Sequence, residues 1–424
     1  MKSSYDVVIV GGAVIGSAVA YFLKANPDFN GSVLVVERDP TYAKASTSLS
    51  SSSIRTQFSN PINVRISQFG SAFIKGFAKT MQVAGEAPPD LNFHQGGYLF
   101  LANSAEQEST LRENHQVQVA CGADVVLWDQ EALHRAFPHL NVEDIRLASY
   151  GQSGEGWFSN TGLMNGFKAK AREQGADYVT DEVVAIGRTG DAVTSVTLKS
   201  GAVVQAGTVV NASGPRAALT ARMAGLDVPV EPRKRTLFVF DCAKTPEGSA
   251  TVNGGRLPLM IDPSGVFCRP EGRFFLSGAA PVEDPAVDWD DFEPRWPEFE
   301  DIIWPALANR SAQFEAIKVV NQWAGHYDFN TLDHNLIVGR HPQVTNFIFA
   351  NGYSGHGLQQ GPAAGRGVAE LVIYNGYRSL DLTEVGYERI LENRPFLEKA
   401  VILNRPRDPS CATGAKMTER RLGE

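Results

Sequence analysis

Residues 7–23 read VVIVGGAVIGSAVAYFL, and this stretch decides the fold. A short apolar run passes into GGAVIG at residues 11–16, and a helical pattern follows. Gly11 permits a tight turn at the end of a strand, and Gly16 lets the next helix pack closely on that strand. The free N–H groups at the start of such a helix point at a pyrophosphate. The stretch therefore predicts a dinucleotide-binding strand, turn and helix.

A second apolar run, residues 33–36, ends in a carboxylate, Glu37. An acidic residue about 20 positions beyond the glycines is expected to bond a ribose hydroxyl. Ala13 departs from the motif, since a glycine usually stands there, so we expect the backbone to approach the phosphate slightly less freely. A signal peptide or membrane span is the alternative. It is disfavoured because the run is short, carries glycines at Rossmann spacing and has no small-residue cleavage site.

The composition is typical of a soluble enzyme. The chain has 424 residues with 43% hydrophobic content, enough for two packed layers or two domains. A net charge of −8 makes nucleic acid and anionic membranes poor partners. Cys121, Cys242, Cys268 and Cys411 lie far apart and form no metal-spaced cluster. We therefore predict small buried thiols in a reducing, cytoplasmic compartment, no metal site and no membrane span.

The chain does not divide into one domain after another. Patterns of strand, helix and glycine-rich turn recur in three stretches that predict one nucleotide-binding domain, residues 1–85, 151–226 and 336–404. Two inserted stretches, residues 86–150 and 227–335, carry short strand signals separated by turns and predict a substrate domain on a mostly antiparallel sheet. The predicted fold class is therefore α/β plus α+β, a Rossmann-like domain with an inserted substrate domain. Residues 405–424 are predicted to be a C-terminal tail.

Some single elements can be predicted as well. A helix is expected over residues 161–174, and a hairpin over residues 193–198 and 203–210. A strand at residues 347–350 is followed by a glycine-rich loop and a helix that runs to Tyr374. Residues 283–300 are acidic and rich in proline and tryptophan, which predicts a solvated loop and a helix start.

Four stretches together resemble the D-amino-acid oxidase and sarcosine oxidase superfamily of FAD enzymes, over nearly the whole chain. They are the N-terminal glycine motif, SSSSIRTQFS at residues 50–59, WAGHYDFNTLD at 323–333 and GYSGHGLQQGP at 352–362. The last stretch is similar to the subgroup called FAD-dependent oxidoreductase domain-containing protein 1. The resemblance implies FAD rather than NAD, and a substrate domain whose sheet covers the flavin. The typical chemistry is oxidation of a C–N bond in an amino acid or N-alkyl amino acid.

The glycine motif and the resemblance together give a set of predicted cofactor-binding residues. Relatives that tether flavin use a cysteine near Gly325 or His326, or a histidine in the serine-rich stretch, and this chain has neither, so non-covalent FAD is expected. The glycines before residue 358 would let the backbone approach a flat ring, and the helix start would stabilise negative charge on reduced flavin. The predicted set is Gly11, Gly12, Ala13, Val14, Ile15, Gly16, Glu37, Arg38, Ser53, Val183, Ala212, Gly214, Gly352, Gly355, Gly357, Leu358, Gln359 and Gln360.

Four residues are candidates for the substrate side. The resemblance places Arg55 near a substrate carboxylate, which a guanidinium fork suits, although a surface or phosphate-facing arginine is the alternative. Tyr327 would line the substrate pocket or simply pack in the core. His356 is either a catalytic base or, as we favour, a structural hydrogen-bonding residue. Gln359 stands where sarcosine oxidases carry a second carboxylate-binding lysine.

These residues predict a flavin enzyme that oxidises a small carboxylate-bearing amine by hydride transfer to N5. Sarcosine oxidases, which the chain resembles, activate oxygen with a lysine on a substrate-domain strand, and the matching strand here, residues 274–278, has no lysine. This leaves a quinone or an electron-carrier protein open as the acceptor. A 2-hydroxy-acid dehydrogenase, with His356 as an essential base, is a second prediction. A third is a flavin-stabilised assembly or interaction factor, for which the polar residues beyond Arg405 could bind a partner.

Overall fold

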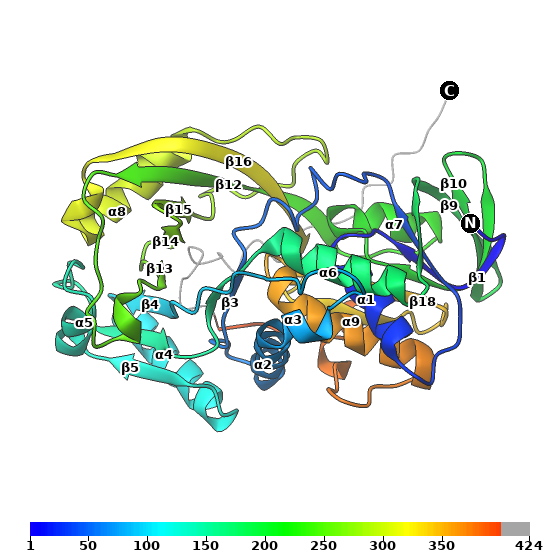
Figure 1. The fold of residues 1–424 in the computed structure, drawn as a ribbon, viewed down its shortest axis with the longest axis horizontal. Helices are drawn as coiled ribbons and strands as arrows, with labels where there is room; N and C mark the ends of the chain where they lie inside the picture. The colour runs from blue at the N-terminus through cyan, green and yellow to red at the C-terminus, as the bar shows by residue number, and fades with distance from the viewer. Residues whose placement is uncertain (400–424) are drawn as a thin grey trace.

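The protein is built on two eight-stranded sheets that lie side by side in an elongated molecule (Figure 1). The structure, a computed structural model, describes residues 1–399. The predicted tail, residues 405–424, and the last five residues of the predicted nucleotide-binding domain lie outside the described residues.

The first sheet is the nucleotide-binding sheet, with β1 (Ser4–Val10) at its centre. β1 pairs in parallel with β11 (Val203–Asn211) on one side and with β2 (Val33–Glu37) on the other. The carboxyl ends of these strands therefore meet at one edge, where α/β sheets bind ligands. The strand order is β17-β18-β11-β1-β2-β8, and β10 and β9 extend the sheet from β11. The remaining strands are β8 (Asp177–Thr180), β9 (Val183–Thr189), β10 (Ala192–Leu198), β17 (Ile337–Arg340) and β18 (Phe347–Asn351).

Alternate side chains of β1 enter two different hydrophobic cores, because successive residues of a strand point to opposite faces. Val7 and Ile9 pack with α1 (Val14–Ala25), α6 (Asn160–Glu173) and α9 (Gly357–Tyr374). Val8 and Val10 pack on the other face, with α7 (Ala217–Met223) and the β9–β10 hairpin. Both faces of the sheet are thus covered, and the turn between β1 and α1 lies at its ligand-binding edge.

The second sheet has the order β16-β12-β15-β14-β13-β4-β6-β5. Its strands pair antiparallel, except for β13, which runs parallel to β4. Two long strands, β12 (Val230–Cys242) and β16 (Ile317–Asn330), run from this sheet toward the nucleotide-binding part (Figure 1). The other strands are β4 (Tyr98–Ala102), β5 (Val125–Trp128), β6 (Leu147–Gly151), β13 (Leu259–Ile261), β14 (Phe267–Glu271) and β15 (Phe274–Gly278).

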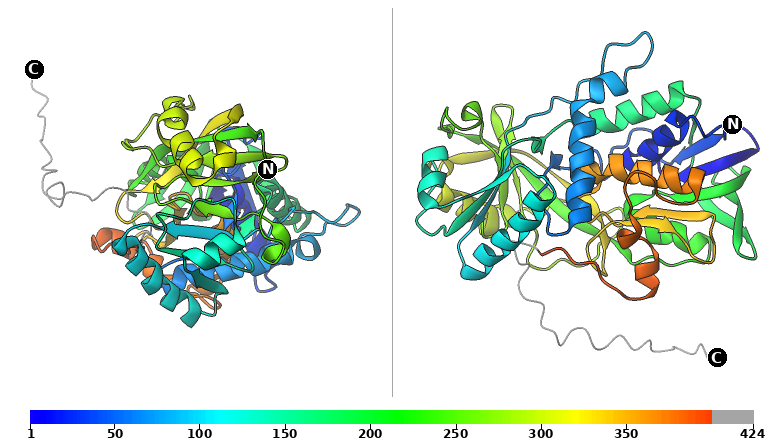
Figure 2. Two further views of the ribbon diagram at one scale, coloured as in Figure 1. Left: turned by 90° about the vertical axis from the view of Figure 1, so that its left-hand side faces the viewer. Right: turned by 90° about the horizontal axis from the view of Figure 1, so that it is seen from below.

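Shorter elements complete the molecule. β3 (Ser53–Ile54) pairs with β7 (Gly156–Trp157) and leads into α2 (Pro61–Lys75), which packs against α9 (Figure 2). Further helices are α3 (Phe77–Thr80), α4 (Ala105–Ala120), α5 (Gln130–Ala136), α8 (Trp304–Arg310) and α10 (Glu388–Leu391). Within residues 1–399, no helix combines the length and the apolar character that a bilayer crossing requires.

The predicted fold class, a Rossmann-like domain with an inserted sheet domain, is confirmed. The predicted hairpin is also confirmed, as β10 and β11, and so is the helix that ends at Tyr374. Residues 283–300 are more than the solvated loop that we predicted, because Trp289 and Phe292 lie on the wall of a cavity and Glu298 is buried. The domain boundaries given above stay a prediction.

Candidate cofactor and substrate site

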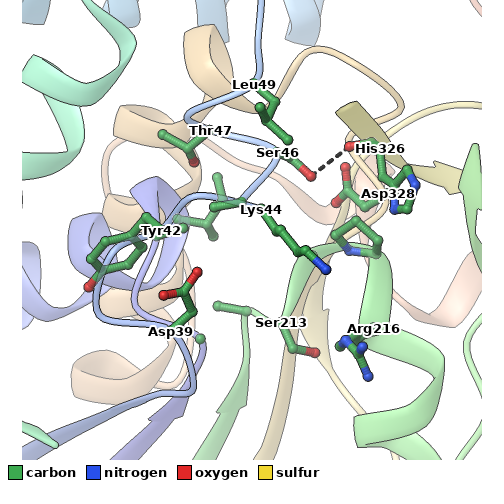
Figure 3. A pocket seen from close by; sticks show the side chains of 18 of the residues that line it. Asp39, Tyr42, Lys44, Ser46, Thr47, Leu49, Ser213, Arg216, His326 and Asp328 are labelled. Atoms are coloured by element: carbon green, nitrogen blue, oxygen red, sulfur yellow. Dashed lines mark hydrogen bonds between the residues drawn. The ribbon is translucent and has the colours of Figure 1, made fainter. Parts of the chain in front are cut away.

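A cavity of about 480 Å³ lies at the carboxyl ends of the parallel strands, beneath β12 and β16. Its walls come from the β1–α1 turn, the segment after β2, the end of β11, the inner face of β16 and the start of α9 (Figure 3). The cavity therefore occupies the place where a doubly wound sheet binds a dinucleotide, and the second sheet closes its other side.

The β1–α1 turn has the geometry of a phosphate cradle. Gly11 has a φ of +98°, and a Cβ there would lie 2.4 Å from the carbonyl oxygen of Ala212. A Cβ on Gly16 would lie 1.9 Å from the carbonyl oxygen of Gly11. Ala13, the N-cap of α1, has a φ of −69°, which any residue adopts, so the missing glycine imposes no backbone strain. The first turn of α1 has no side-chain cap from Ala13 and can offer N–H groups to a phosphate.

Glu37 lies at the end of β2 and lines the same cavity. Its Oε2 accepts the N–H of Gly12 at 2.8 Å, and its Oε1 accepts the N–H of Asp39 at 2.9 Å. Burial raises the pKa of Glu37, and these two N–H groups oppose that shift. The carboxylate is thus fixed in place while keeping acceptor capacity for a ribose hydroxyl.

The cavity wall includes twelve of the predicted cofactor residues: Gly11, Ala13, Val14, Ile15, Glu37, Arg38, Val183, Ala212, Gly214, Gly355, Gly357 and Leu358. Six others are not among its lining residues: Gly12, Gly16, Ser53, Gly352, Gln359 and Gln360. Two of these six support the site indirectly. Gly16 allows the close contact between α1 and the β1–α1 turn, and the N–H of Gly12 donates to Glu37. Of the four substrate-side candidates, Tyr327 lines this cavity, whereas Arg55, His356 and Gln359 form a neighbouring cluster.

Arg55 lies in that cluster with its guanidinium among aromatic rings. The guanidinium carbon is 4.5 Å from the ring centre of Phe58, 5.3 Å from that of Tyr98 and 5.7 Å from that of Phe100. Within residues 1–399, no carboxylate forms an ion pair with Arg55, and its buried Nε has no hydrogen-bond acceptor. Aromatic faces stabilise a cation without consuming its N–H donors, so the guanidinium keeps donors for a ligand.

Gln359 and His356 hold Arg55 from the start of α9. The backbone N–H of Arg55 donates to Oε1 of Gln359 at 2.9 Å, and Nη2 of Arg55 lies 3.0 Å from Nε2 of His356. Burial, together with the charge of Arg55, lowers the pKa of His356 to about 3. The imidazole is therefore neutral at physiological pH and accepts from Arg55, which agrees with the structural role that we favoured over a catalytic base.

Glu155 anchors the segment that carries Arg55, and the sequence prediction missed it. Its Oε1 accepts from the backbone N–H of Thr56 at 2.7 Å and from the hydroxyl of Thr56, and its Oε2 accepts from Nε2 of Gln57 at 2.9 Å. Glu155 is 1% exposed, and burial raises its pKa. Its partners lie about 100 residues away in sequence, so no local pattern could have identified it.

Tyr327 lies on β16 with its ring against Gly355, where a Cβ would be 2.5 Å from the ring. The guanidinium of Arg235 lies over the same ring, 4.8 Å from its centre. Asp284 holds Arg235 with two hydrogen bonds of 2.6 Å. Burial raises the pKa of Tyr327, so its hydroxyl is protonated at neutral pH.

Residues 284–292, which we call the strap, cross the cavity. Trp289, Asp290 and Phe292 line it, and Nε1 of Trp289 donates to the carbonyl of Pro215 at 3.2 Å. The ring of Phe292 stacks on His326 with centres 4.2 Å apart. The acidic composition of this segment drew attention in the sequence, but its place over the cavity could not be predicted from composition.

The segment after β2 supplies a second group of lining residues that the sequence prediction missed, Tyr42, Lys44, Ala45, Ser46, Thr47 and Leu49 (Figure 3). The hydroxyl of Thr47 accepts the N–H of Val14 at 3.3 Å, which ties this segment to the start of α1. The hydroxyl of Ser46 donates to the backbone carbonyl of His326 at 2.6 Å. The serine-rich run that begins at residue 46 was the feature of the sequence that could have identified these lining residues.

The residues of the cavity fit FAD. The β1–α1 turn is a cradle that a Cβ would fill, Glu37 is an acceptor for a ribose hydroxyl, and Tyr353 brings a buried phenol without a partner within residues 1–399. The helix dipole of α9 has its positive end at the cavity, beside Gly357 and Leu358. Together these features suit a ligand with a pyrophosphate, a ribose and a flat polar ring.

Comparison with known proteins also indicates an FAD-binding protein. Residues 6–371 match the DAO family, described as FAD dependent oxidoreductase. FAD-dependent oxidoreductase domain-containing protein 1 of Xenopus laevis is 39% identical, over 94% of this chain and 85% of that protein, and the Mus musculus protein of the same name is 35% identical, over 91% and 84%. The fold is that of L-proline dehydrogenase from P. horikoshii, with a TM-score of 0.81, 24% identity and coverage of 93% and 100%. Glycine oxidase from Geobacillus kaustophilus gives a TM-score of 0.75 at 22% identity, over 91% and 98%.

The phosphate cradle, the ribose acceptor and the enclosing second sheet thus agree with the family match over most of the chain. This protein belongs to the DAO family of FAD-dependent oxidoreductases, and FAD is its cofactor.

Proposed function

We propose that this protein oxidises the C–N bond of a small carboxylate-bearing amine, such as an N-alkyl amino acid, a D-amino acid or an opine-like compound. Bound FAD, held non-covalently, would supply the hydride acceptor. Glycine oxidase of Bacillus licheniformis is 24% identical over 88% of this chain, and the β subunit of sarcosine oxidase from an Arthrobacter species is 28% identical over 54%. The names of these relatives support amine chemistry.

The unpaired cation at Arg55 carries the proposal. Its guanidinium has spare donors and no carboxylate partner within the described residues, and it is surrounded by Phe58, Tyr98 and Phe100. A substrate carboxylate would complete this charge-assisted pair. Gln359 holds the Arg55 backbone, and neutral His356 holds one end of the guanidinium. These two residues would orient the arginine rather than react.

Tyr327 would shape the wall between Arg55 and the cofactor cavity. Its ring contacts both Gly355 and Arg235, and its raised pKa keeps the hydroxyl available as a donor. The proposed reaction needs the amine in its neutral form, and a neutral amine can give up hydride without a strong protein base. A hydroxy-acid substrate would need such a base, and an imidazole with a pKa of about 3 is too weak for that role.

The acceptor and the compartment stay predictions. A quinone or an electron-carrier protein is our expectation for the acceptor, because β15 carries no lysine. The cytoplasmic location rests on composition alone.

Anaerobic bleaching of the flavin tests the proposal. The holoprotein is mixed with N-alkyl amino acids, D-amino acids, opines and 2-hydroxy acids, and bleaching by amines is expected. Arg55→Ala should lower kcat/KM for the active amine roughly 30-fold to several thousand-fold, which corresponds to about 2–5 kcal/mol for a buried charged pair. Arg55→Lys should recover only part of the loss, because an ammonium cannot form the two-point fork.

The amide analogue of the substrate separates binding from folding. Arg55→Ala should affect the carboxylate substrate far more than its amide, while the flavin spectrum stays near wild type. Arg112→Ala, an exposed arginine paired with Glu108 on α4, is the matched control. Equal losses for the acid and the amide would show that Arg55 serves the flavin or the fold instead, and bleaching by hydroxy acids alone would contradict the amine assignment.

A further inference from the structure

A buried carboxylate, Asp328, faces the cofactor cavity from the substrate-domain strand β16. Asp328 is 7% exposed and lies on the cavity wall near Ser46 and His326 (Figure 3). It follows Tyr327 directly, and both residues line the cavity beside the loop that leads into α9. Tyr327 packs on Gly355 of that loop, and Asp328 accepts the N–H of Tyr353.

The side chain of Asp328 is only partly satisfied by protein groups. Its Oδ2 accepts the N–H of Tyr353 at 3.2 Å, and its backbone carbonyl accepts the N–H of Ser354 at 3.1 Å. The backbone N–H groups of Gly352 and of Asp328 itself also act on the carboxyl group, and no ion pair with Asp328 occurs within residues 1–399. A buried carboxyl group without a cation is costly as an anion, so its remaining hydrogen-bonding capacity is directed to the cavity.

The charged groups around Asp328 do not compensate it. Titratable side chains on the elements packed around it are His326 and Tyr327 on β16, Tyr353 and His356 before α9, Lys44 after β2, Arg216 before α7, and Glu231, Arg233, Lys234 and Arg235 on β12. Each of the five cations among them is paired with a carboxylate. Lys44 and Arg216 pair with Asp290, Lys234 with Asp291, Arg235 with Asp284, and Arg233 with Glu231. Burial raises the pKa of Asp328 to about 7, against the pull of the backbone N–H groups.

FAD brings further negative charge to this cavity, since its pyrophosphate is ionised at neutral pH. A second buried anion beside it would be unfavourable, whereas a neutral carboxyl group can donate to any of the acceptor oxygens and nitrogens of the cofactor. We propose that Asp328 is a cofactor ligand contributed by the substrate domain, and that its carboxyl group carries a proton and donates it in a hydrogen bond to an acceptor atom of FAD.

The pH dependence of FAD affinity tests this assignment without any substrate. Serial dilutions of the holoprotein between pH 6 and 8.5 give the Kd from the fluorescence of released FAD. If bound FAD favours protonated Asp328, the pKa is higher in the complex than in the free protein. Affinity is then fully present below pH 7 and is lost as the pH rises, at a limit of about tenfold per pH unit.

Two variants distinguish the effect of the Asp328 proton on FAD affinity from the effect of the side chain itself. Asp328→Asn keeps a neutral donor of similar shape, so its Kd should stay within about threefold of the wild-type value at pH 6 and should not change with pH. Asp328→Ala should raise the Kd roughly 5- to 100-fold at pH 6, also without pH dependence, which is the range for one lost hydrogen bond to a buried group. Asp301→Asn, an exposed acid of the substrate domain, should match wild type.

Three results would overturn the proposal. An unchanged Kd in Asp328→Ala would show that the side chain does not bind FAD. A loss in Asp328→Asn equal to that in Asp328→Ala would mean that an ionised acceptor is required. A wild-type affinity that rises with pH would mean the same. If Asp328→Ala fails to fold, the loss of the pH dependence in folded Asp328→Asn decides the question.

Discussion

At the scale of single residues, Glu37 shows how one carboxylate can organise both the protein and the site. It accepts hydrogen bonds from the N–H groups of Gly12 and Asp39 and presents its remaining lone pairs to the cavity. Glu37→Ala should therefore weaken FAD binding by about 1–3 kcal/mol, or roughly 5- to 150-fold in Kd. Glu37→Gln keeps one acceptor oxygen, so its loss should be smaller. Free FAD in diluted holoprotein gives both values, and an unchanged affinity would mean that another residue holds the ribose.

At the scale of elements, the contact between β1 and α1 depends on the absence of one methyl group. A Cβ on Gly16 would lie 1.9 Å from the carbonyl oxygen of Gly11, so Gly16→Ala must displace the turn that forms the phosphate cradle. The expected cost is about 1–3 kcal/mol of stability, as for other overpacked sites, with at least a tenfold weaker binding of FAD. Thermal melting and FAD release measure the two effects.

Gly361 on α9 provides the matched control for that substitution. Its nearest neighbours would be side-chain carbons of Ile15 and Val14, 3.5 and 3.6 Å from an added Cβ, which is ordinary packing distance. Gly361→Ala should be neutral or slightly stabilising, because alanine favours a helix interior. Equal losses of stability and FAD binding in both variants would show that the close contact at Gly16 is not the cause.

At the scale of the whole molecule, the strap joins the two parts of the protein across the cavity. Asp290 reaches Lys44 at 3.5 Å and Arg216 at 3.7 Å, both on the nucleotide-binding side. Asp290→Asn removes both pairs, each worth about 0.2–1 kcal/mol at an exposed site. FAD should therefore leave the holoprotein roughly two- to thirtyfold faster at low salt.

Salt distinguishes this electrostatic effect from a packing effect. In 1 M NaCl the exposed pairs are screened, so release from the wild type should approach that from Asp290→Asn. Glu293→Gln, an exposed strap neighbour without an ion pair within residues 1–399, is the control and should release FAD at the wild-type rate at both salt concentrations. A difference between wild type and Asp290→Asn that persists at high salt would contradict an electrostatic role of the Asp290 ion pairs.

The sequence by itself determined the nucleotide-binding half, because its signals are local. Gly11, Gly16 and Glu37 stand at spacings that backbone geometry imposes, and the apolar runs have the period of the elements that they form. The segment 50–59 and the loop before α9 were recognisable for a different reason, since their residues match a known family. The roles of Arg55, His356 and Gln359 nevertheless stayed open, because each depends on neighbours elsewhere in the chain.

The tertiary structure decided how the distant segments meet. Glu155 fixes Thr56 and Gln57 from about 100 residues away, and the strap reaches Lys44 from more than 200. Burial and the charge of Arg55 lower the pKa of His356, and this supports the structural role that the sequence favoured without deciding. Asp328 stands in a stretch that matches the family, but its role was not predicted, because it depends on a position on the cavity wall where no cation within residues 1–399 pairs with it. Spacing along the chain fixes local geometry, whereas burial and charge pairing arise only when the chain has folded.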